Sequence, residues 1–127
     1  MAKQFTLGKQ ERLKRRKIIE QLFSEGKSLA VFHVRVQYKL YQQELATPLQ
    51  AGFSASSRTF KKAVDRNRIK RLMREAYRLQ KNTLQQTLQT KQQQLALFFI
   101  FTGRELPDFA TINEKINVIL NKLVKVV

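Results

Sequence analysis

The segment between residues 58 and 78 is the part of this chain best equipped to act on another molecule. It holds nine Lys or Arg residues and two acids. On a 3.6-residue repeat its polar and cationic side chains share one side: Asn67, Lys70, Arg71, Arg74 and Arg78. The opposite side is apolar: Ile69, Leu72, Met73 and Ala76. A helix with this pattern buries one side and presents a row of cations, whose mutual repulsion an extended polyanion would relieve.

Most of the remaining positive charge lies at the N-terminus. The 127 residues carry a net charge of +16, and residues 1–17 and 58–78 together hold seven plus nine basic groups against one plus two acids, or +13. Clustering of this kind predicts a nucleic-acid partner, with an acidic membrane surface as a weaker second reading. No apolar run approaches the roughly 18 residues of a membrane span, and residues 1–17 lack the apolar core of a secretory signal. We therefore expect a cytoplasmic protein that does not enter a membrane.

Catalytic and metal-binding groups are sparse in the sequence. There is no Cys, His33 is the one His, and the nine acids are dispersed without a pair placed for hydrolysis. Asp65 and Glu75 are interpreted as a helix cap and a salt-bridge partner. No nucleophile–base set or glycine-rich phosphate loop is evident. The sequence predicts no catalytic residue, no metal site, no cofactor bound by the protein alone and no small-molecule substrate.

The hydrophobic pattern predicts one domain over residues 1–127, with helices and strands in the order αβββαβα. Gly26 is expected to close the first helix in a left-handed conformation. The Gln-rich stretch 82–94 is not assigned, although Leu84 and Leu88 could extend the preceding helix. The expected elements are a flexible basic arm (1–8), a helix (9–25), strands (28–56), an Arg-rich helix (65–81), a strand (95–102) and a helix (111–125).

Alternation along the strands predicts which side chains share a face of the sheet. In the strand near 49–55, one face carries small polar residues: Gln50, Gly52, Ser54 and Ser56. Such a face fills little volume and leaves room for another molecule against the sheet. The strand at 95–102 is continuously apolar, which predicts burial on both faces. It should run parallel to the strand at 49–55 if the two are neighbours, because a helix connects them, and such a crossover is ordinarily right-handed.

Several motifs occur in a fixed order along the chain. They are Arg12-Leu13-Lys14, Leu22-Phe23, Gly26, Gly52-Phe53-Ser54, the basic loop 58–63 and the Arg-Asn-Arg helix at residues 66–68. Together they resemble the protein subunit of bacterial ribonuclease P from about residue 7 to residue 125, and the Arg-Asn-Arg helix is the most specific of them. The resemblance implies an α+β fold: an α/β sandwich with a mixed, mainly antiparallel four-stranded sheet packed by three helices. It further implies similarity to the second domain of a ribosomal protein and a left-handed β-α-β crossover in place of the right-handed one.

The resemblance also implies a function and its partners. In that family the catalyst is an RNA that uses bound metal ions, here expected to be Mg²⁺, to remove the 5′ leader of precursor tRNA. The protein binds the catalytic RNA and holds the leader in a cleft between the first helix and the sheet. The implied RNA-subunit contacts are Arg58, Lys61, Lys62, Arg66, Asn67, Arg68, Lys70, Arg71 and Arg74. The implied leader cleft comprises Arg12, Lys14, Ile19, Phe23, Arg35, Gln37, Tyr38, Ser54 and Ser56.

Departures from the family pattern leave some assignments open. Ile19 replaces an aromatic residue of the cleft, and Ser57-Arg58 stands where the family has two Lys residues. A third cleft aromatic aligns with Gln37 or Tyr38, which point to opposite faces of a strand. The position of Phe23 is equally consistent with burial in the core and with lining the cleft. Ser54 and Ser56 could simply face water. Two other functions remain: a structural protein that binds ribosomal RNA, and a nuclease that acts without RNA.

Overall fold

A computed structural model describes residues 8–127; the predicted flexible arm at 1–8 falls almost entirely outside this range. A single 3₁₀ turn, η1 (Lys9–Glu11), precedes the regular elements. The helices are α1 (Arg16–Glu25), α2 (Ala63–Gln80), α3 (Asn82–Lys91) and α4 (Phe109–Val126). The strands are β1 (Lys27–Val31), β2 (Val34–Tyr41), β3 (Leu49–Ala55) and β4 (Gln94–Phe101). The order αβββααβα differs from the prediction by one additional helix, α3.

The four strands form one mixed sheet in the order β1-β2-β4-β3. β1 pairs antiparallel with β2, and β2 pairs antiparallel with β4. β3 and β4 are parallel neighbours, as predicted, because the chain between them returns through α2 and α3. The left-handed sense of that crossover stays a prediction. The last strand in the chain therefore lies in the middle of the sheet.

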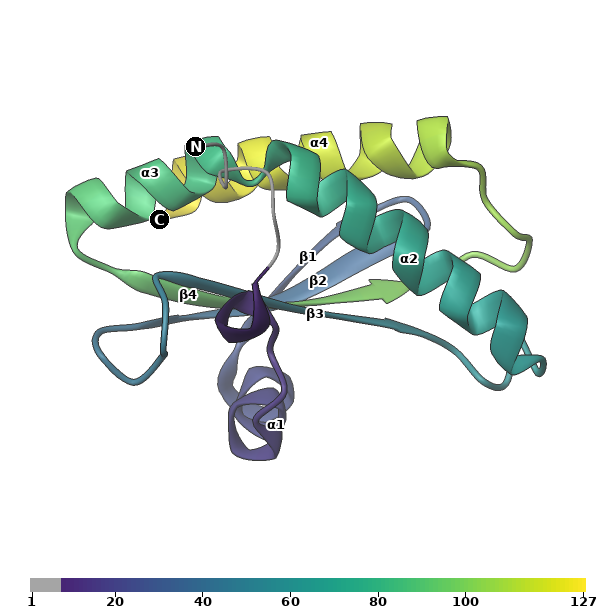
Figure 1. The fold of residues 1–127 in the computed structure, drawn as a ribbon, viewed down its shortest axis with the longest axis horizontal. Helices are drawn as coiled ribbons and strands as arrows, with labels where there is room; N and C mark the ends of the chain where they lie inside the picture. Colours follow the sequence, from purple (N-terminus) through teal and green to yellow (C-terminus); the bar gives the residue numbers. More distant parts are fainter. Residues whose placement is uncertain (1–7) are drawn as a thin grey trace.

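Helices cover the two faces of the sheet unequally (Figure 1). α2, α3 and α4 lie over one face and enclose the main core, in which Tyr77 and Phe99 are fully buried. α1 alone lies on the other face, where Ile18 and Leu22 pack with Tyr41 and Ala96 in a smaller cluster. A single short helix cannot cover a four-stranded sheet, so part of this second face stays accessible.

The predicted helix at 9–25 begins later than expected, because residues 12–14 are extended along the edge of β3. Arg12 forms an isolated parallel bridge with Ala51, and the N–H of Leu13 donates to the carbonyl of Ala51 at 2.9 Å. Leu13 is buried in the smaller cluster. Pairing with an open strand edge and burial of Leu13 outweigh the helical preference of this stretch.

Gly26 ends α1, although not in the predicted left-handed conformation. Its φ of −77° and ψ of 170° are extended. A Cβ atom at this position would lie 2.5 Å from the carbonyl oxygen of Leu22 and 2.8 Å from that of Tyr38. Glycine is needed here because two backbone carbonyl groups approach its Cα closely. A sequence pattern for helix capping does not indicate this contact.

The remaining boundaries shift by one or two residues, and the unassigned Gln-rich stretch is largely α3. The Arg-rich helix starts at Ala63 with Lys62 as its N-cap, so Asp65 lies in the first turn and is not the cap. In α3, Leu84 and Leu88 are buried, and the helix ends where Gln92 is left-handed at φ 56°. α4 is capped by Asp108, whose carboxylate accepts from the N–H of Thr111 at 2.8 Å.

Candidate nucleic-acid interface

α2 has the orientation that its sequence pattern predicts. Ile69, Met73, Ala76 and Tyr77 are buried in the main core. The cations project from the other side of the helix, where Arg68 and Arg71 are exposed and Lys70 and Arg74 are half-buried. We call the following set the basic surface: Arg58, Lys61, Lys62, Arg66, Asn67, Arg68, Lys70, Arg71 and Arg74. It consists of the predicted RNA-subunit contacts, all carried by α2 and the loop before it.

The cations of the basic surface have no carboxylate partner within residues 8–127. The ion pairs that the structure shows there are Arg16–Glu20, Lys39–Glu25, Arg78–Glu75, Lys81–Glu11 and Lys115–Glu114. Glu75 is engaged by Arg78, whose Nε lies 3.1 Å from its Oε1, and this hydrogen bond lowers the pKa of Glu75. The acid of α2 predicted to form a salt bridge therefore binds Arg78, which is outside the basic surface.

Arg66 shapes the loop that carries the first cations. Its Nη1 donates to the carbonyls of Phe60 and Lys61 at 2.7 and 3.0 Å. At the start of the loop, the hydroxyl of Ser56 accepts from the N–H groups of Arg58 and Thr59 at 3.2 and 3.3 Å. Ser56 follows the end of β3 and organises this turn, and its predicted role in the cleft stays a prediction.

The two basic blocks of the sequence meet at Arg74. Its pKa is lowered by burial first, then by the positive charges of Arg12 and Arg71. The guanidinium also lies over the ring of Phe53, 5.8 Å from its centroid. The bridge to Ala51 at the edge of β3 thus brings the charge of Arg12 within range of Arg74, and its predicted role in the cleft stays a prediction. The local crowding of cations is the electrostatic condition under which a bound anion is favourable.

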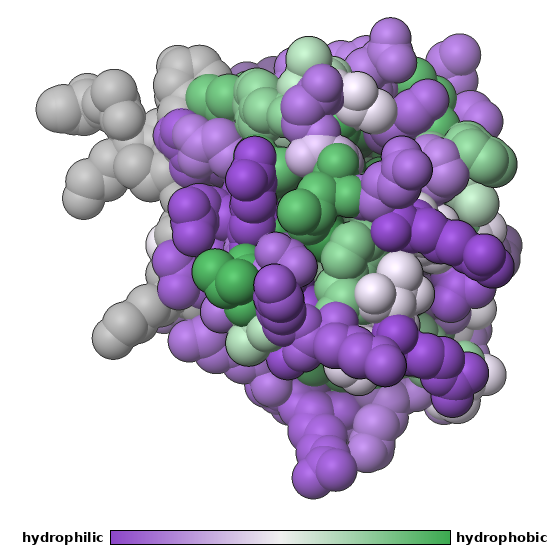
Figure 2. Space-filling model, turned by 90° about the vertical axis from the view of Figure 1, so that its right-hand side faces the viewer, coloured by the Kyte–Doolittle hydropathy of each residue, from purple (hydrophilic) through white to green (hydrophobic). Residues whose placement is uncertain are grey.

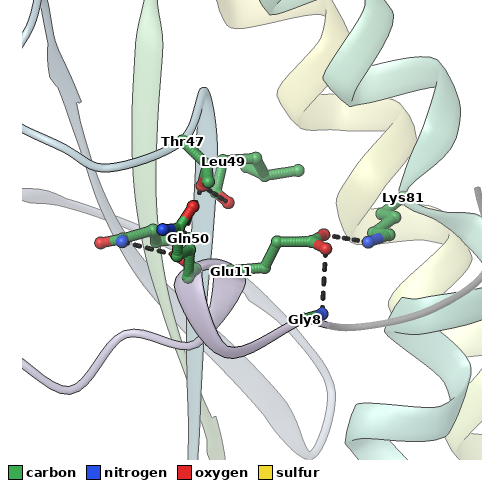
Figure 3. Close-up of polar contacts among 7 residues, drawn as sticks. Gly8, Glu11, Thr47, Leu49, Gln50 and Lys81 are labelled. Carbon is green, nitrogen blue, oxygen red and sulfur yellow. Dashed lines mark hydrogen bonds and ion pairs between the residues drawn. The ribbon is translucent and has the colours of Figure 1, made fainter. Parts of the chain in front are cut away.

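A buried ion pair anchors the N-terminal segment that carries Arg12 (Figure 3). The carboxylate of Glu11 contacts the ammonium of Lys81, which is only 2% exposed, and also accepts from the N–H of Gly8 at 3.0 Å. Gln50 donates from its amide to the carbonyl of Gln10 at 2.7 Å. This segment is thus tied to both the α2–α3 junction and β3, a link that sequence periodicity could not indicate.

The accessible sheet face beside α1 is the second candidate surface. The Gln37 amide donates to the carbonyl of Leu22 in α1 at 3.2 Å, so Gln37 lies on this face. Tyr38 packs against the main core on the opposite face. Of the two residues left open by the sequence, Gln37 thus lies on the α1 side of the sheet and Tyr38 on the other side, and their roles in binding a leader stay predictions.

Strand register arranges the other residues of this surface in two rows. We call the six residues of these rows, named in the next two sentences, together with Phe23 of α1, the α1-side face. One row runs from β3 through β4 to β2 as Gly52, Phe98 and Gln37. The next row, in the same order, is Ser54, Ile100 and Arg35. The predicted residues Ser54, Arg35 and Gln37 are thus brought together.

Phe23 and Phe98 give the α1-side face its aromatic character. Phe23 is 48% exposed, and the two rings meet edge to face with centroids 5.6 Å apart. Gly52 makes room for the Phe98 ring, because a Cβ there would lie 2.6 Å from Cδ1. Phe98 is not among the residues predicted for the cleft, because the apolar run of β4 predicted burial on both faces of the sheet. Strict alternation from the buried Leu97 and Phe99 would have identified it.

The other two predicted cleft residues lie at the margin of this surface. Ile19 is half-buried and packs against the smaller cluster, as a core residue would. Lys14 is exposed in the extended segment before α1. The α1-side face is consequently built from fewer residues than the resemblance implied, with Phe98 and Ile100 in addition.

Comparisons with known proteins show the family to which this chain belongs. A profile of the ribonuclease P family, described as "Ribonuclease P", matches residues 7–124. The chain belongs to the ribonuclease P protein family. It is 43% identical over 108 residues to the ribonuclease P protein component of Porphyromonas gingivalis ATCC 33277, covering 85% of this chain and 79% of that protein. Members of this family are subunits of a ribonucleoprotein endoribonuclease that processes tRNA.

Solved structures of the family share the fold. The RNase P protein from Thermotoga maritima is 28% identical, with a TM-score of 0.67 over 92% of this chain and 98% of that one. A Staphylococcus aureus RNase P protein structure has a TM-score of 0.71 at 19% identity, covering 88% and 94% of the two chains. The α+β fold with a mixed four-stranded sheet, predicted from the resemblance, is confirmed.

The described residues offer little for other kinds of chemistry. Within 8–127, no three His, Asp or Glu side chains gather in a way that could hold a metal ion. None of the helices found there is long and apolar enough to cross a membrane. The side chains of the two surfaces can bind a partner by charge, hydrogen bonding and ring stacking.

Proposed function

We propose that this chain binds the catalytic RNA of ribonuclease P through the basic surface and the 5′ leader of precursor tRNA along the α1-side face. The observation that carries the proposal is the presence of these two different surfaces on one small fold. One is a helix side of unpaired cations, and the other is a partly covered sheet face with two aromatic rings. Family membership supports the assignment of both to ribonuclease P.

The basic surface suits a folded RNA because its charges are gathered on the helix α2 and the loop before it. Arg68 and Arg71 are exposed and can each present a planar fork of donors to phosphate oxygens. Neutralising phosphates releases condensed counterions, which gives most of the affinity and makes it depend on salt. Arg66 donates hydrogen bonds to two carbonyl groups of the loop. Its role is therefore to position Lys61 and Lys62 as well as to contact RNA.

The α1-side face suits a single strand. Bases that are not paired can stack on Phe23 and Phe98, whereas a duplex would not expose its ring faces. Gln37 and Ser54 add hydrogen-bonding groups beside the rings, and Arg35 adds one cation for the backbone. Stacking tolerates any base, so this face is expected to bind leaders of many sequences.

Hydrolysis itself is assigned to the RNA partner and its Mg²⁺ ions, an assignment that membership of the ribonuclease P family supports. The cations of the basic surface replace diffuse counterions around the folded RNA. The protein should therefore lower the Mg²⁺ concentration that cleavage requires.

Reconstitution with a bacterial ribonuclease P RNA and a precursor tRNA tests the proposal. At low Mg²⁺, cleavage should depend on the protein, and a precursor with a leader should bind the holoenzyme more tightly than mature tRNA. Equal cleavage with and without the protein, at every Mg²⁺ concentration, would refute the proposal. The two alternatives from the sequence, a ribosomal RNA-binding protein and an RNA-independent nuclease, gain no support from the relatives.

A further inference from the structure

The turn between β1 and β2 carries two aromatic rings that the fold does not require. Phe32 and His33 form a two-residue connection between the paired Val31 and Val34. Phe32 is 75% exposed, and its ring centroid lies 3.9 Å from that of His33. Short hairpins of this kind favour Asn, Asp and Gly. His33 has a φ of 79°, in the left-handed region where a side chain is unfavourable.

Contacts with the end of β4 hold this turn in place. The N–H of Thr102 donates to the carbonyl of His33 at 2.8 Å. Gly103 packs so closely that a Cβ there would lie 2.7 Å from Phe101 Cζ and 3.2 Å from His33 Nδ1. The exposed rings therefore stand on a fixed support, which reduces the entropy lost when they bind a ligand.

A pocket of about 670 Å³ opens beside the two rings. It is bounded by the turn, the loop 102–108 between β4 and α4, and the start of α4. Its cationic lining residues are Arg35, Arg104 and Lys115, and among the described residues that line it Glu105 is the one acid. Figure 2 faces this end of the molecule and shows hydrophobic side chains surrounded by hydrophilic ones. The pocket thus combines ring faces, an apolar lining and an excess of positive charge.

We propose that this pocket, which we call the hairpin pocket, binds an unstacked nucleotide of the precursor's leader, beyond the part held by the α1-side face. The proposal rests on the proposed function and extends it to a second stacking position. The base would stack on the exposed ring of Phe32, with Arg35 and Arg104 available to the phosphates. Exposed rings flanked by cations are the usual composition of a site for single-stranded nucleic acid.

Arg35 connects the two sites and is the reason for choosing the leader. It lies on the α1-side face opposite Ile100 and also lines the hairpin pocket. From Gln37, β2 runs back to the turn over a distance of about 15 Å at roughly 3.3 Å per residue. A strand that stacks on Phe23 and Phe98 and follows β2 therefore arrives at Phe32.

Holoenzyme affinity for precursors with leaders of graded length tests this assignment. Phe32→Leu retains apolar volume and removes the ring, whereas Phe32→Tyr retains the ring. We expect Phe32→Leu to weaken binding of the longest leaders by about 5-fold or more, and Phe32→Tyr to restore it. Val126→Ala, a matched change at an exposed apolar residue outside the pocket, should leave all affinities unchanged. Melting temperatures verify that each variant is folded.

Any other result would contradict the assignment, and each such result indicates a different cause. Equal weakening for long leaders, short leaders and mature tRNA would mean that Phe32 contacts the catalytic RNA or the tRNA body. No weakening at any length would mean that the pocket takes no leader base. If the unsubstituted protein itself shows no preference for a leader, the proposed function fails as well, and Phe23→Ala will then also have no effect.

His33→Gly provides a second measurement with a different signature. Glycine accepts the positive φ without strain, so the variant should melt at a higher temperature or unchanged. Loss of the ring next to Phe32 should nevertheless weaken the long-leader complex. A variant that binds long leaders as well as the original protein would show that His33 only shapes the turn and does not support stacking.

Discussion

The basic surface and the α1-side face differ in how they are built. The basic surface comes from one continuous stretch, and helical periodicity sets the side on which its α2 residues lie. The α1-side face takes Phe23, Gln37, Gly52 and Phe98 from four elements, and strand register and the packing of α1 bring them together. The arrangement of side chains within the first surface follows from local structure, whereas the arrangement of the second follows from long-range pairing. Charge dominates binding at the basic surface, whereas shape and aromatic rings dominate binding at the α1-side face. A substitution should therefore disturb one surface without the other.

The largest expected effect is on the basic surface. The double substitution Arg68→Glu and Arg71→Glu should weaken binding of the catalytic RNA by at least about 100-fold, because two phosphate contacts become repulsions. For the original protein, neutralising six to ten phosphates predicts a loss of about 10³- to 10⁵-fold between 50 and 200 mM salt. Filter binding across a salt series measures both. Lys122→Glu, on the exposed side of α4, is the matched control, and a flat salt response would contradict the assignment.

The next effect concerns the α1-side face alone. Phe23→Ala should weaken binding of precursor tRNA to the holoenzyme by about 1–3 kcal/mol, the contribution of one base stacked on a ring. Binding of mature tRNA and of the catalytic RNA should not change. Phe23→Tyr should behave like the original protein. Equal losses for precursor and mature tRNA would show that the two surfaces are not separable.

A smaller effect is expected in the free protein, where cations crowd near Arg12, Arg71 and Arg74. Sulfate or phosphate should raise the melting temperature, because an anion that binds only the folded state stabilises it. Arg74→Gln should reduce the gain, since it removes a charge whose pKa is lowered by burial and by neighbouring cations. Thermal unfolding at matched ionic strength, with chloride as the comparison, measures this. The same shift with chloride would indicate general screening.

The smallest effect concerns the Glu75–Arg78 pair. Glu75→Gln removes a negative charge from the helix that carries the basic surface, so it should raise RNA affinity a few-fold, measured by filter binding. The pKa of Glu75 is lowered by its hydrogen bond with Arg78. The stability that the pair contributes is therefore present above the pKa of an ordinary glutamate and is lost as the pH falls through the lowered pKa of Glu75. Acid unfolding of Glu75→Gln should therefore depend less on pH. An unchanged RNA affinity would show that the charge of Glu75 does not act on the interface.

The parts of the structure that sequence could predict are those fixed by local periodicity. The burial of Ile69 and Met73 and the opposite placement of the cations follow from the helical repeat. The faces of β3 were likewise predicted by alternation. The helix α3 was missed because its surface is almost uncharged and only Leu84 and Leu88 carry the pattern.

The parts that sequence could not predict depend on long-range pairing. Leu13 is extended rather than helical because it pairs with Ala51. Gln37 could be chosen over Tyr38 only when the packing of α1 on β2 was known. Ser56 follows a strand by one residue, and its hydroxyl accepts from two N–H groups of the next turn. One-residue shifts of this kind reverse the direction of a side chain.

The position of β4 has a consequence for synthesis on the ribosome. This strand joins β2 to β3, yet it is made after both and after α2 and α3. A nascent chain that has not reached residue 101 cannot close the sheet, so the apolar side of α2 has no complete partner to cover it. The polycationic helix should then become an ordered ligand for RNA only once almost the whole chain has emerged. Truncation before β4 should accordingly abolish both surfaces at once.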